Sequence, residues 1–166
     1  MSNKRKCSLL LVVPIVLASC AGGEDLYRAN EEGMDNPRLA RLAETDWSQA
    51  ETLEVSLTEF AYDPAVLTFK VGSPYRLRLS NLGEVTHYFV SEAFFEAIDV
   101  WKLEKPDGAV ERPRLQSVAL EPGSEKEIWF VASLPGDYEF YCTAPLHSLL
   151  GMEGQIRIVP EGQAGG

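Results

Sequence analysis

The residues best suited to chemistry in this chain are one cysteine, two histidines and one methionine. Cys142, His147 and Met152 follow one another at intervals of five near the C-terminus, and His87 is the only other histidine. A soft thiolate, two imidazoles and a weakly bound thioether suit an ion that alternates between Cu(I) and Cu(II). The pattern therefore predicts one mononuclear copper site.

The cysteine inventory favours a metal-binding role for Cys142. Of the other two cysteines, Cys7 lies in the N-terminal leader and Cys20 directly follows it, where it is expected to be modified, so Cys142 has no disulfide partner in the domain. A lone thiol in an exported protein is open to oxidation, and metal ligation is a reason to keep it. Taken singly, each residue has a simpler interpretation: a buried thiol acts as a small hydrophobe, a methionine fills core space, and a histidine forms ordinary hydrogen bonds.

The N-terminus has the pattern of an export signal. Basic residues 4–6 precede an apolar stretch over 9–17. The tetrapeptide Leu17-Ala18-Ser19-Cys20 resembles the lipobox of bacterial lipoproteins. This resemblance implies that residues 1–19 are a signal peptide and that Cys20 carries acyl chains such as palmitate, which hold a protein to a bilayer. An ordinary signal peptide cleaved elsewhere and an uncleaved anchor are the alternatives.

These features predict a periplasmic or otherwise extracytoplasmic protein anchored to a membrane through Cys20. Ala21 stands where an aspartate would resemble an inner-membrane retention signal, which favours the outer membrane in a cell that has one. The chain has 15 basic and 25 acidic residues, and loss of the three basic residues of the leader leaves a net charge of −13. Such a surface argues against nucleic-acid binding. It indicates either a basic protein partner or no more than solubility.

The chain divides into four parts. After the leader, we expect residues 20–50 to form a tether with a short helix over 38–43, begun by Asn36 as cap and Pro37 as first residue. Residues 51–160 form the folded domain, and residues 161–166 form a flexible tail.

The domain consists of short β-branched or alternating runs separated by turn residues, which is typical of an all-β sandwich. Strands are predicted over 52–58, 66–71, 75–80, 86–90, 116–120, 125–131, 136–141 and 154–159. Residues 92–99 carry Phe94, Phe95 and Ile98 at helical spacing, and residues 100–114 follow with a turn at 105–108. We expect residues 92–114 to be a short helical insertion packed on the sandwich.

The segment Tyr141–Met152, with the upstream segment Asn81–His87, closely resembles the cupredoxins, the group of plastocyanin, azurin and auracyanin. The resemblance covers roughly residues 52–159 and implies a Greek-key β-sandwich with copper at one end. The implied ligands are His87 Nδ1, Cys142 Sγ, His147 Nδ1 and Met152 Sδ. The Cys-to-His interval resembles azurin and auracyanin, whereas the His-to-Met interval resembles plastocyanin.

The resemblance also implies roles for residues around the ligands. Those expected to surround the metal are Asn81, Tyr88, Thr143, Ala144 and Pro145. Backbone N–H groups of Ala144 and Tyr88 are candidate donors to the cysteine sulfur, whereas Pro145 has no N–H group. His147 is expected to reach the surface as the electron port, and His87 to be buried. Leu146, Leu149 and Leu150 around the port are interpreted as a docking surface, with plain loop packing as the alternative.

The predicted function is one-electron transfer between redox proteins, such as a cytochrome and an oxidase or reductase, without catalysis. A dinuclear copper centre needs two cysteines, and multicopper oxidases and nitrite reductases need histidines beside the cysteine, where this chain has Tyr141 and Thr143. A copper carrier or storage protein is the alternative, although its exchangeable sites are generally rich in Met or His. A metal-free interaction module is a third possibility.

Overall fold

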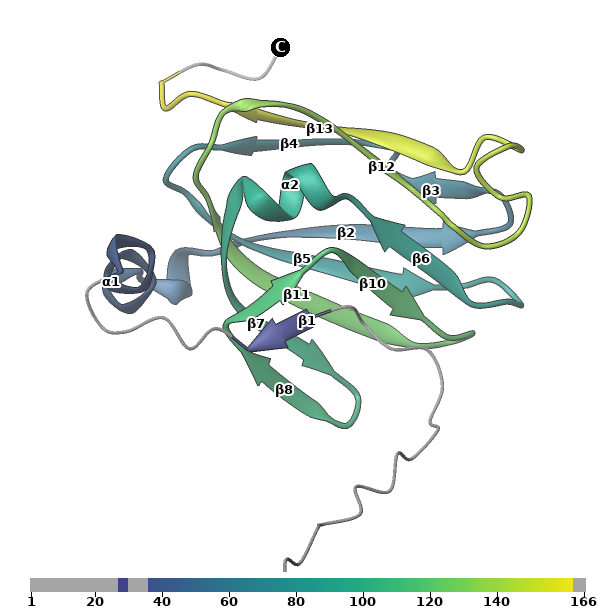
Figure 1. The fold of residues 1–166 in the computed structure, drawn as a ribbon, viewed down its shortest axis with the longest axis horizontal. Coiled ribbons are helices and arrows are strands. Elements are labelled where there is room, and N and C mark those ends of the chain that lie inside the picture. Colours follow the sequence, from purple (N-terminus) through teal and green to yellow (C-terminus); the bar gives the residue numbers. More distant parts are fainter. Residues whose placement is uncertain (1–26, 30–35, 163–166) are drawn as a thin grey trace, which may run out of the picture.

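The predicted strands pack as two sheets (Figure 1). The computed structural model describes residues 27–29 and 36–162. Within them, one sheet has the order β10-β6-β12-β13-β4 and the other the order β3-β2-β5-β11-β7-β8, while β1 pairs with β9. The predicted all-β sandwich is confirmed. In this part of the chain, no helix is both long enough and apolar enough to cross a bilayer.

The bounds of the elements are as follows: β1 (Tyr27–Ala29), α1 (Pro37–Glu44), a 3₁₀ turn (Trp47–Gln49), β2 (Glu51–Thr58), β3 (Ala61–Asp63), β4 (Val66–Lys70), β5 (Pro74–Asn81), β6 (His87–Val90), α2 (Glu92–Glu96), β7 (Ile98–Lys105), β8 (Gly108–Glu111), β9 (Pro113–Leu115), β10 (Ser117–Leu120), β11 (Glu125–Ala132), β12 (Gly136–Tyr141) and β13 (Glu153–Val159). Each of the predicted strands is present with ends that agree within one residue. The short strands β1, β3, β8 and β9 were not predicted.

The segment 92–114 differs from the expected helical insertion. The helix α2 ends at Glu96, and Ile98 already begins β7, which lies between β11 and β8 in the six-stranded sheet. Phe94, Phe95 and Ile98 are all buried, as their helical spacing suggested, but Ile98 reaches the core from a strand. The open edge of β11 supplies hydrogen-bond partners along β7, and this long-range pairing outweighs the local periodicity. The turn at 105–108 is confirmed as the β7–β8 connection.

The segment 36–50 also differs from expectation. The predicted helix is confirmed: the Asn36 side chain caps its N-terminus by accepting from the Arg38 backbone N–H, and Pro37 is its first residue. This helix is not part of a tether, however, because Leu42 is buried and two of its arginines form ion pairs with Asp99 of β7. The predictions for residues 1–19, for Cys20 and for the tether segments 20–26 and 30–35 lie outside the described residues.

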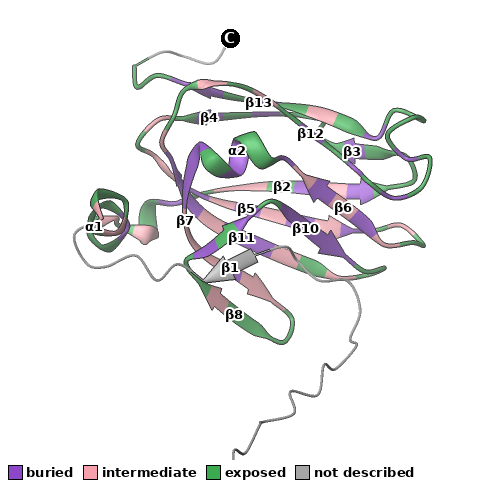
Figure 2. Cartoon of the chain, in the orientation of Figure 1, coloured by how far each residue is buried: buried purple, intermediate pink, exposed green. Residues whose placement is uncertain are grey.

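The core lies between the two sheets (Figure 2). Alternate residues of β5 point inward, which is the two-residue period of a strand with one buried face. The fully buried aromatic side chains are Phe69, Phe89, Phe94, Phe130 and Phe140. Burying a side chain of this size contributes about 1.5–3 kcal/mol. This packing holds β6 and β12, which lead to the site, in a fixed position.

Candidate metal centre

Neighbouring strands bring the four predicted ligands to one end of the sandwich. His87 is the first residue of β6, and β6 and β12 meet where Val90 pairs with Tyr141, the residue before Cys142. Cys142, His147 and Met152 then lie in or at the ends of the β12–β13 connection, at the right of Figure 1. The strand pairing thus brings two segments 55 residues apart into contact at the cysteine sulfur.

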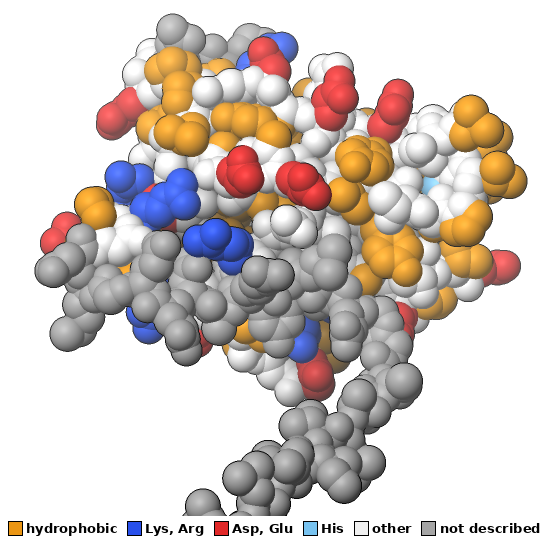
Figure 3. All heavy atoms as spheres, in the orientation of Figure 1, with side chains coloured by type: hydrophobic (Ala, Val, Ile, Leu, Met, Phe, Trp, Pro, Cys, Tyr) orange, Lys and Arg blue, Asp and Glu red, His pale blue; other side chains and the backbone are white. Residues whose placement is uncertain are grey.

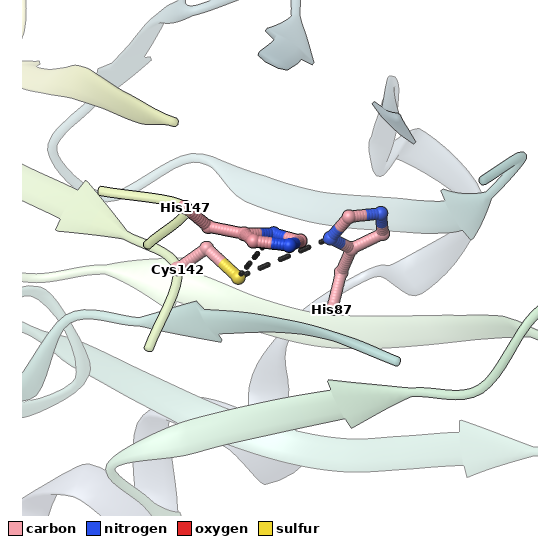
Figure 4. Close-up of side chains that lie close together, drawn as sticks. All are labelled: His87, Cys142 and His147. Atoms are coloured by element: carbon pink, nitrogen blue, oxygen red, sulfur yellow. Dashed lines mark hydrogen bonds between the residues drawn. The ribbon is translucent and has the colours of Figure 1, made fainter. Parts of the chain in front are cut away.

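The donor atoms converge on one point. Cys142 Sγ lies 3.9 Å from His87 Nδ1 and 3.6 Å from His147 Nδ1, and both rings turn toward the sulfur in Figure 4. Met152 Sδ lies 3.4 Å from His147 Nδ1. For a first-row ion with bonds of about 2.1 Å to imidazole and 2.3 Å to thiolate, tetrahedral geometry separates the two ligand atoms by roughly 3.6 Å. The observed separations fit a single ion between them.

The site is shielded from water. His87, Cys142 and Met152 are essentially fully buried, whereas His147 keeps 6% of its surface exposed. The loop that carries three of the residues is closed by its own backbone. The Cys142 N–H donates to the Met152 carbonyl (3.1 Å), and the Met152 N–H donates to the His147 carbonyl (2.9 Å). The donor atoms are therefore held in place by the fold.

The comparisons with known proteins agree with this geometry. The family model described as a cupredoxin-like domain matches residues 39–156. The chain belongs to the cupredoxin family. This family membership and the clustered His, Cys and His donors, with the Met sulfur beside them, indicate a single type 1 copper ion as the cofactor. No curated protein matches the chain in sequence.

Two multicopper oxidases of known structure show the same fold at low sequence identity. The McoA multicopper oxidase of Aquifex aeolicus has 15% identity and a TM-score of 0.56, over 69% of this cupredoxin and 30% of that chain. The Campylobacter jejuni multicopper oxidase has 14% identity and a TM-score of 0.54, over 71% of this cupredoxin and 31% of that chain. The auracyanin of Roseiflexus castenholzii has 24% identity and a TM-score of 0.48, over 68% of this cupredoxin and 99% of that chain. The cupredoxin thus spans about a third of the length of these oxidases.

The residues expected around the ligands take different positions. The Ala144 N–H donates to Cys142 Sγ (3.4 Å), as proposed from the sequence. Tyr88 pairs with Ala119 in β10, and its carbonyl accepts from the Tyr62 hydroxyl (2.5 Å). No hydrogen bond from Tyr88 to the sulfur is found among the described residues. Thr143 and Pro145 are exposed on the loop.

Asn81 fixes the loop that precedes His87. Its buried amide donates to the carbonyls of Val85 (2.8 Å) and Leu120 (2.7 Å), and its Oδ1 accepts from the Gly83 N–H (2.9 Å). The expectation placed Asn81 near the metal ligands. In the structure its side chain forms hydrogen bonds with the backbone of Gly83 and Val85, in the loop that precedes His87.

Two residues at the site were not predicted from the sequence. The turn between β2 and β3 places Glu59 beside His87, with Oε1 3.4 Å from Nε2, and Phe60 beside His147, edge to face with ring centroids 4.9 Å apart. No spacing rule links residues 59 and 60 to residues 87 and 147, so no motif in the sequence could have indicated them. The only available signal was an aromatic residue, Phe60, two positions after the end of a predicted strand.

The electrostatics favour neutral imidazole at His87. Burial lowers the pKa of His87 below its usual value, the Glu59 carboxylate partly opposes this by attraction, and the nearby His147 lowers the pKa further. The pKa of Glu59 is lowered chiefly because backbone N–H groups, first that of Glu84, donate to its carboxylate. The site thus has an ionised carboxylate against a neutral ring at neutral pH, and a neutral ring is the form that binds a metal.

The surface around His147 is apolar. Leu146, Leu149 and Leu150, the proposed docking residues, are exposed, and Leu149 is 81% exposed. Phe60, Leu82 and Val85 from two neighbouring loops are exposed as well. We call these six residues the apolar patch. Figure 3 shows hydrophobic side chains gathered at this end of the molecule around a small area of histidine surface.

Proposed function

We propose that this cupredoxin is a one-electron carrier whose copper ion is held by His87, Cys142, His147 and Met152. The convergence of these buried donor atoms, within 4.8 Å of one another for the two histidines and the cysteine, is the observation that supports the proposal most directly. When bound there, copper alternates between Cu(I) and Cu(II) and so takes up and releases one electron.

The protein's own residues keep rearrangement small. The buried ligands exclude water, and the backbone hydrogen bonds of the loop 142–152 keep the ligand positions the same in both oxidation states. The Ala144 N–H bond to Cys142 Sγ reduces the electron density on the thiolate, which is one way in which a protein sets a reduction potential. A fixed, dry site of this kind favours rapid electron exchange over binding and conversion of a substrate.

The proposed electron port is His147, at the centre of the apolar patch. An exposed cluster of large apolar side chains is typical of a protein interaction site. We propose that a redox partner, such as a cytochrome, an oxidase or a reductase, docks here. The acidic composition of the chain, with 25 acidic against 15 basic residues, favours a basic partner.

An enzymatic role would need further metal sites. Multicopper oxidases and copper nitrite reductases are among the structural neighbours, but the likeness concerns the fold. Cys142 is flanked by Tyr141 and Thr143, and both histidines of the chain are used at the proposed site. The residues that remain therefore favour electron transfer by itself. We further propose that Cys20 is lipidated and holds the protein at an extracytoplasmic membrane surface.

The copper site is tested by adding Cu(II) to the purified chain without its leader and recording visible and electron paramagnetic resonance spectra. We expect an intense thiolate-to-copper band that is lost in Cys142→Ser and retained in Thr143→Ser, a control at the exposed neighbouring residue. Absence of the band in the wild-type protein would refute the proposal.

A second measurement separates an electron carrier from a copper carrier. We expect reversible voltammetry and slow loss of copper to a chelator, because the donor atoms are buried and held by the backbone. Rapid loss of copper to the chelator would instead favour delivery of copper to another protein.

A further inference from the structure

The imidazole of His87 lies between a sulfur and a carboxylate. Its Nδ1 faces Cys142 Sγ at 3.9 Å, and its Nε2, on the other side of the ring, lies 3.4 Å from Glu59 Oε1. The side chain of His87 is fully buried, whereas the side chain of Glu59 is 30% exposed. Among the described residues, this buried Nε2 atom has no hydrogen-bond partner, and Glu59 Oε1, at 3.4 Å, is the carboxylate oxygen beside it. Glu59 is thus the acceptor that the structure offers to the outer nitrogen.

The carboxylate of Glu59 is held in place independently of the ring. Its Oε1 accepts from the backbone N–H groups of Glu84 (2.8 Å) and Val85 (3.1 Å). These groups belong to the same loop that Asn81 ties from the inside. The loop before His87 is therefore held by the buried Asn81 side chain on one side and by the Glu59 carboxylate on the other. The position of the carboxylate does not depend on the imidazole or on a metal.

Gly83 allows this close approach. A Cβ atom at position 83 would lie 2.6 Å from both carboxylate oxygens of Glu59 and 2.7 Å from His87 Nε2. Real Cβ atoms essentially never come so close to other atoms, so any side chain here would displace the carboxylate or the ring. The absence of a side chain at this position is what permits the carboxylate and the ring to meet.

We propose that Glu59 is a positioning residue for His87: its carboxylate accepts a hydrogen bond from the Nε2–H group and so leaves Nδ1 unprotonated and directed at Cys142. The inference rests on the proposed function, because it treats His87 as a copper ligand. A metal-bound histidine commonly donates its other ring N–H to a carboxylate or carbonyl, which fixes the tautomer and makes the imidazole a stronger ligand. In this chain the partner is a charged side chain from the β2–β3 turn, a different part of the chain from all four proposed ligands.

The first test uses the metal-free protein. Nitrogen-15 NMR of the imidazoles, at a pH where His87 is neutral, reports which ring nitrogen carries the proton. We expect the Nε2–H tautomer to predominate in the wild-type protein and in Glu59→Gln, whose amide oxygen still accepts. We expect a mixture of tautomers in Glu59→Ala. The matched control is Glu84→Gln, which removes a charge from an exposed side chain of the same loop. A wild-type tautomer ratio in Glu59→Ala would overturn the proposal.

The second test uses the copper-loaded protein. Removing the hydrogen-bond acceptor of the outer ring nitrogen of a metal-bound histidine typically lowers metal affinity 10- to 100-fold. We expect a loss of Cu(II) affinity of about this size in Glu59→Ala. A carboxylate stabilises Cu(II) more than Cu(I), so its removal in Glu59→Ala should raise the reduction potential. The rise is about 59 mV for each tenfold by which the loss of Cu(II) affinity exceeds the loss of Cu(I) affinity. Glu59→Gln should lie between the wild-type protein and Glu59→Ala.

The controls keep the inference separate from the proposed function. If Glu59→Ala does not fold, the comparison of Glu59→Gln with Glu84→Gln decides: the first must raise the potential more than the second. Equal shifts would mean that Glu59 only closes the loop, and the inference fails while the copper site stands. If the wild-type protein takes up no copper at all, the proposed function fails, and so does the inference that depends on it.

Discussion

At each end of the sandwich a carboxylate joins segments that are far apart in the sequence (Figure 1). At the α1 end, the fully buried carboxylate of Asp99 forms ion pairs with Arg38 (2.9 Å) and Arg41 (2.8 Å) and accepts from the Ser133 hydroxyl. At the other end, Glu59 faces two backbone N–H groups and the neutral ring of His87.

The polar groups at the two ends differ in role: those around Asp99 stabilise the fold, whereas those around Cys142 are suited to binding a metal. The opposite charges of Asp99 and its two arginines compensate one another, and these ion pairs hold α1 on the domain. Around Cys142, a sulfur and two ring nitrogens face one another, and their protein environment leaves them available for a metal. We therefore expect variants at the two ends to have separable effects on stability and on copper binding.

The largest expected effect comes from Cys142→Ser. Copper that binds only the folded protein stabilises it by about 4 kcal/mol at a free concentration 1,000 times the dissociation constant. We expect copper to raise the free energy of unfolding of the wild-type protein by this order and to leave that of the variant unchanged. Thermal or denaturant unfolding with and without copper measures the difference. Equal stabilisation of both proteins would show that copper binds elsewhere.

Asp99→Asn should have the next largest effect, at the opposite end. Hydrogen bonds to charged groups contribute about 1.5–3 kcal/mol, and we expect a loss of this size in the free energy of unfolding. The two arginines remain half-exposed to water, which keeps the loss from being larger. The copper spectrum should not change. A changed thiolate-to-copper band in this variant would break the comparison, because the two ends would then be coupled.

Met152→Leu should act on the potential more than on the fold. The two side chains have similar volumes, and such exchanges in a core usually cost less than about 1.5 kcal/mol. Removing the thioether would take away a weak ligand that stabilises Cu(II), so voltammetry should show a higher potential with copper still bound. An unchanged potential would remove Met152 from the ligand set.

Phe60→Ala should have the smallest effect and should act on one histidine only. Edge-to-face contacts between aromatic rings contribute about 0.5–1.5 kcal/mol, and the 41% exposure of Phe60 places the cost at the low end. We expect NMR signals of the His147 ring to shift while those of His87 stay in place. Comparable shifts in both rings would show that the β2–β3 turn acts as one unit on the whole site.

The strands and most of the candidate ligand set could be predicted from the sequence because both depend on short-range patterns. The strands follow from alternating residues bounded by turns, and three ligands lie within eleven positions of one loop. His87 could be added because the chain has only two histidines. The resemblance to cupredoxins supplied the atoms through which the ligands act, and the structure brings these atoms together.

The tertiary structure decided the rest, because those features depend on pairing between distant segments. Ile98 belongs to a strand since β11 has an open edge beside it, and α1 is bound to the domain since Asp99 is buried within reach of its arginines. Glu59 meets His87 only because the β2–β3 turn and the loop before β6 lie side by side and Gly83 leaves room. Residue types and spacing along the chain determine which candidate donor atoms exist. The packing of the sheets determines which other side chains contact the residues that carry them.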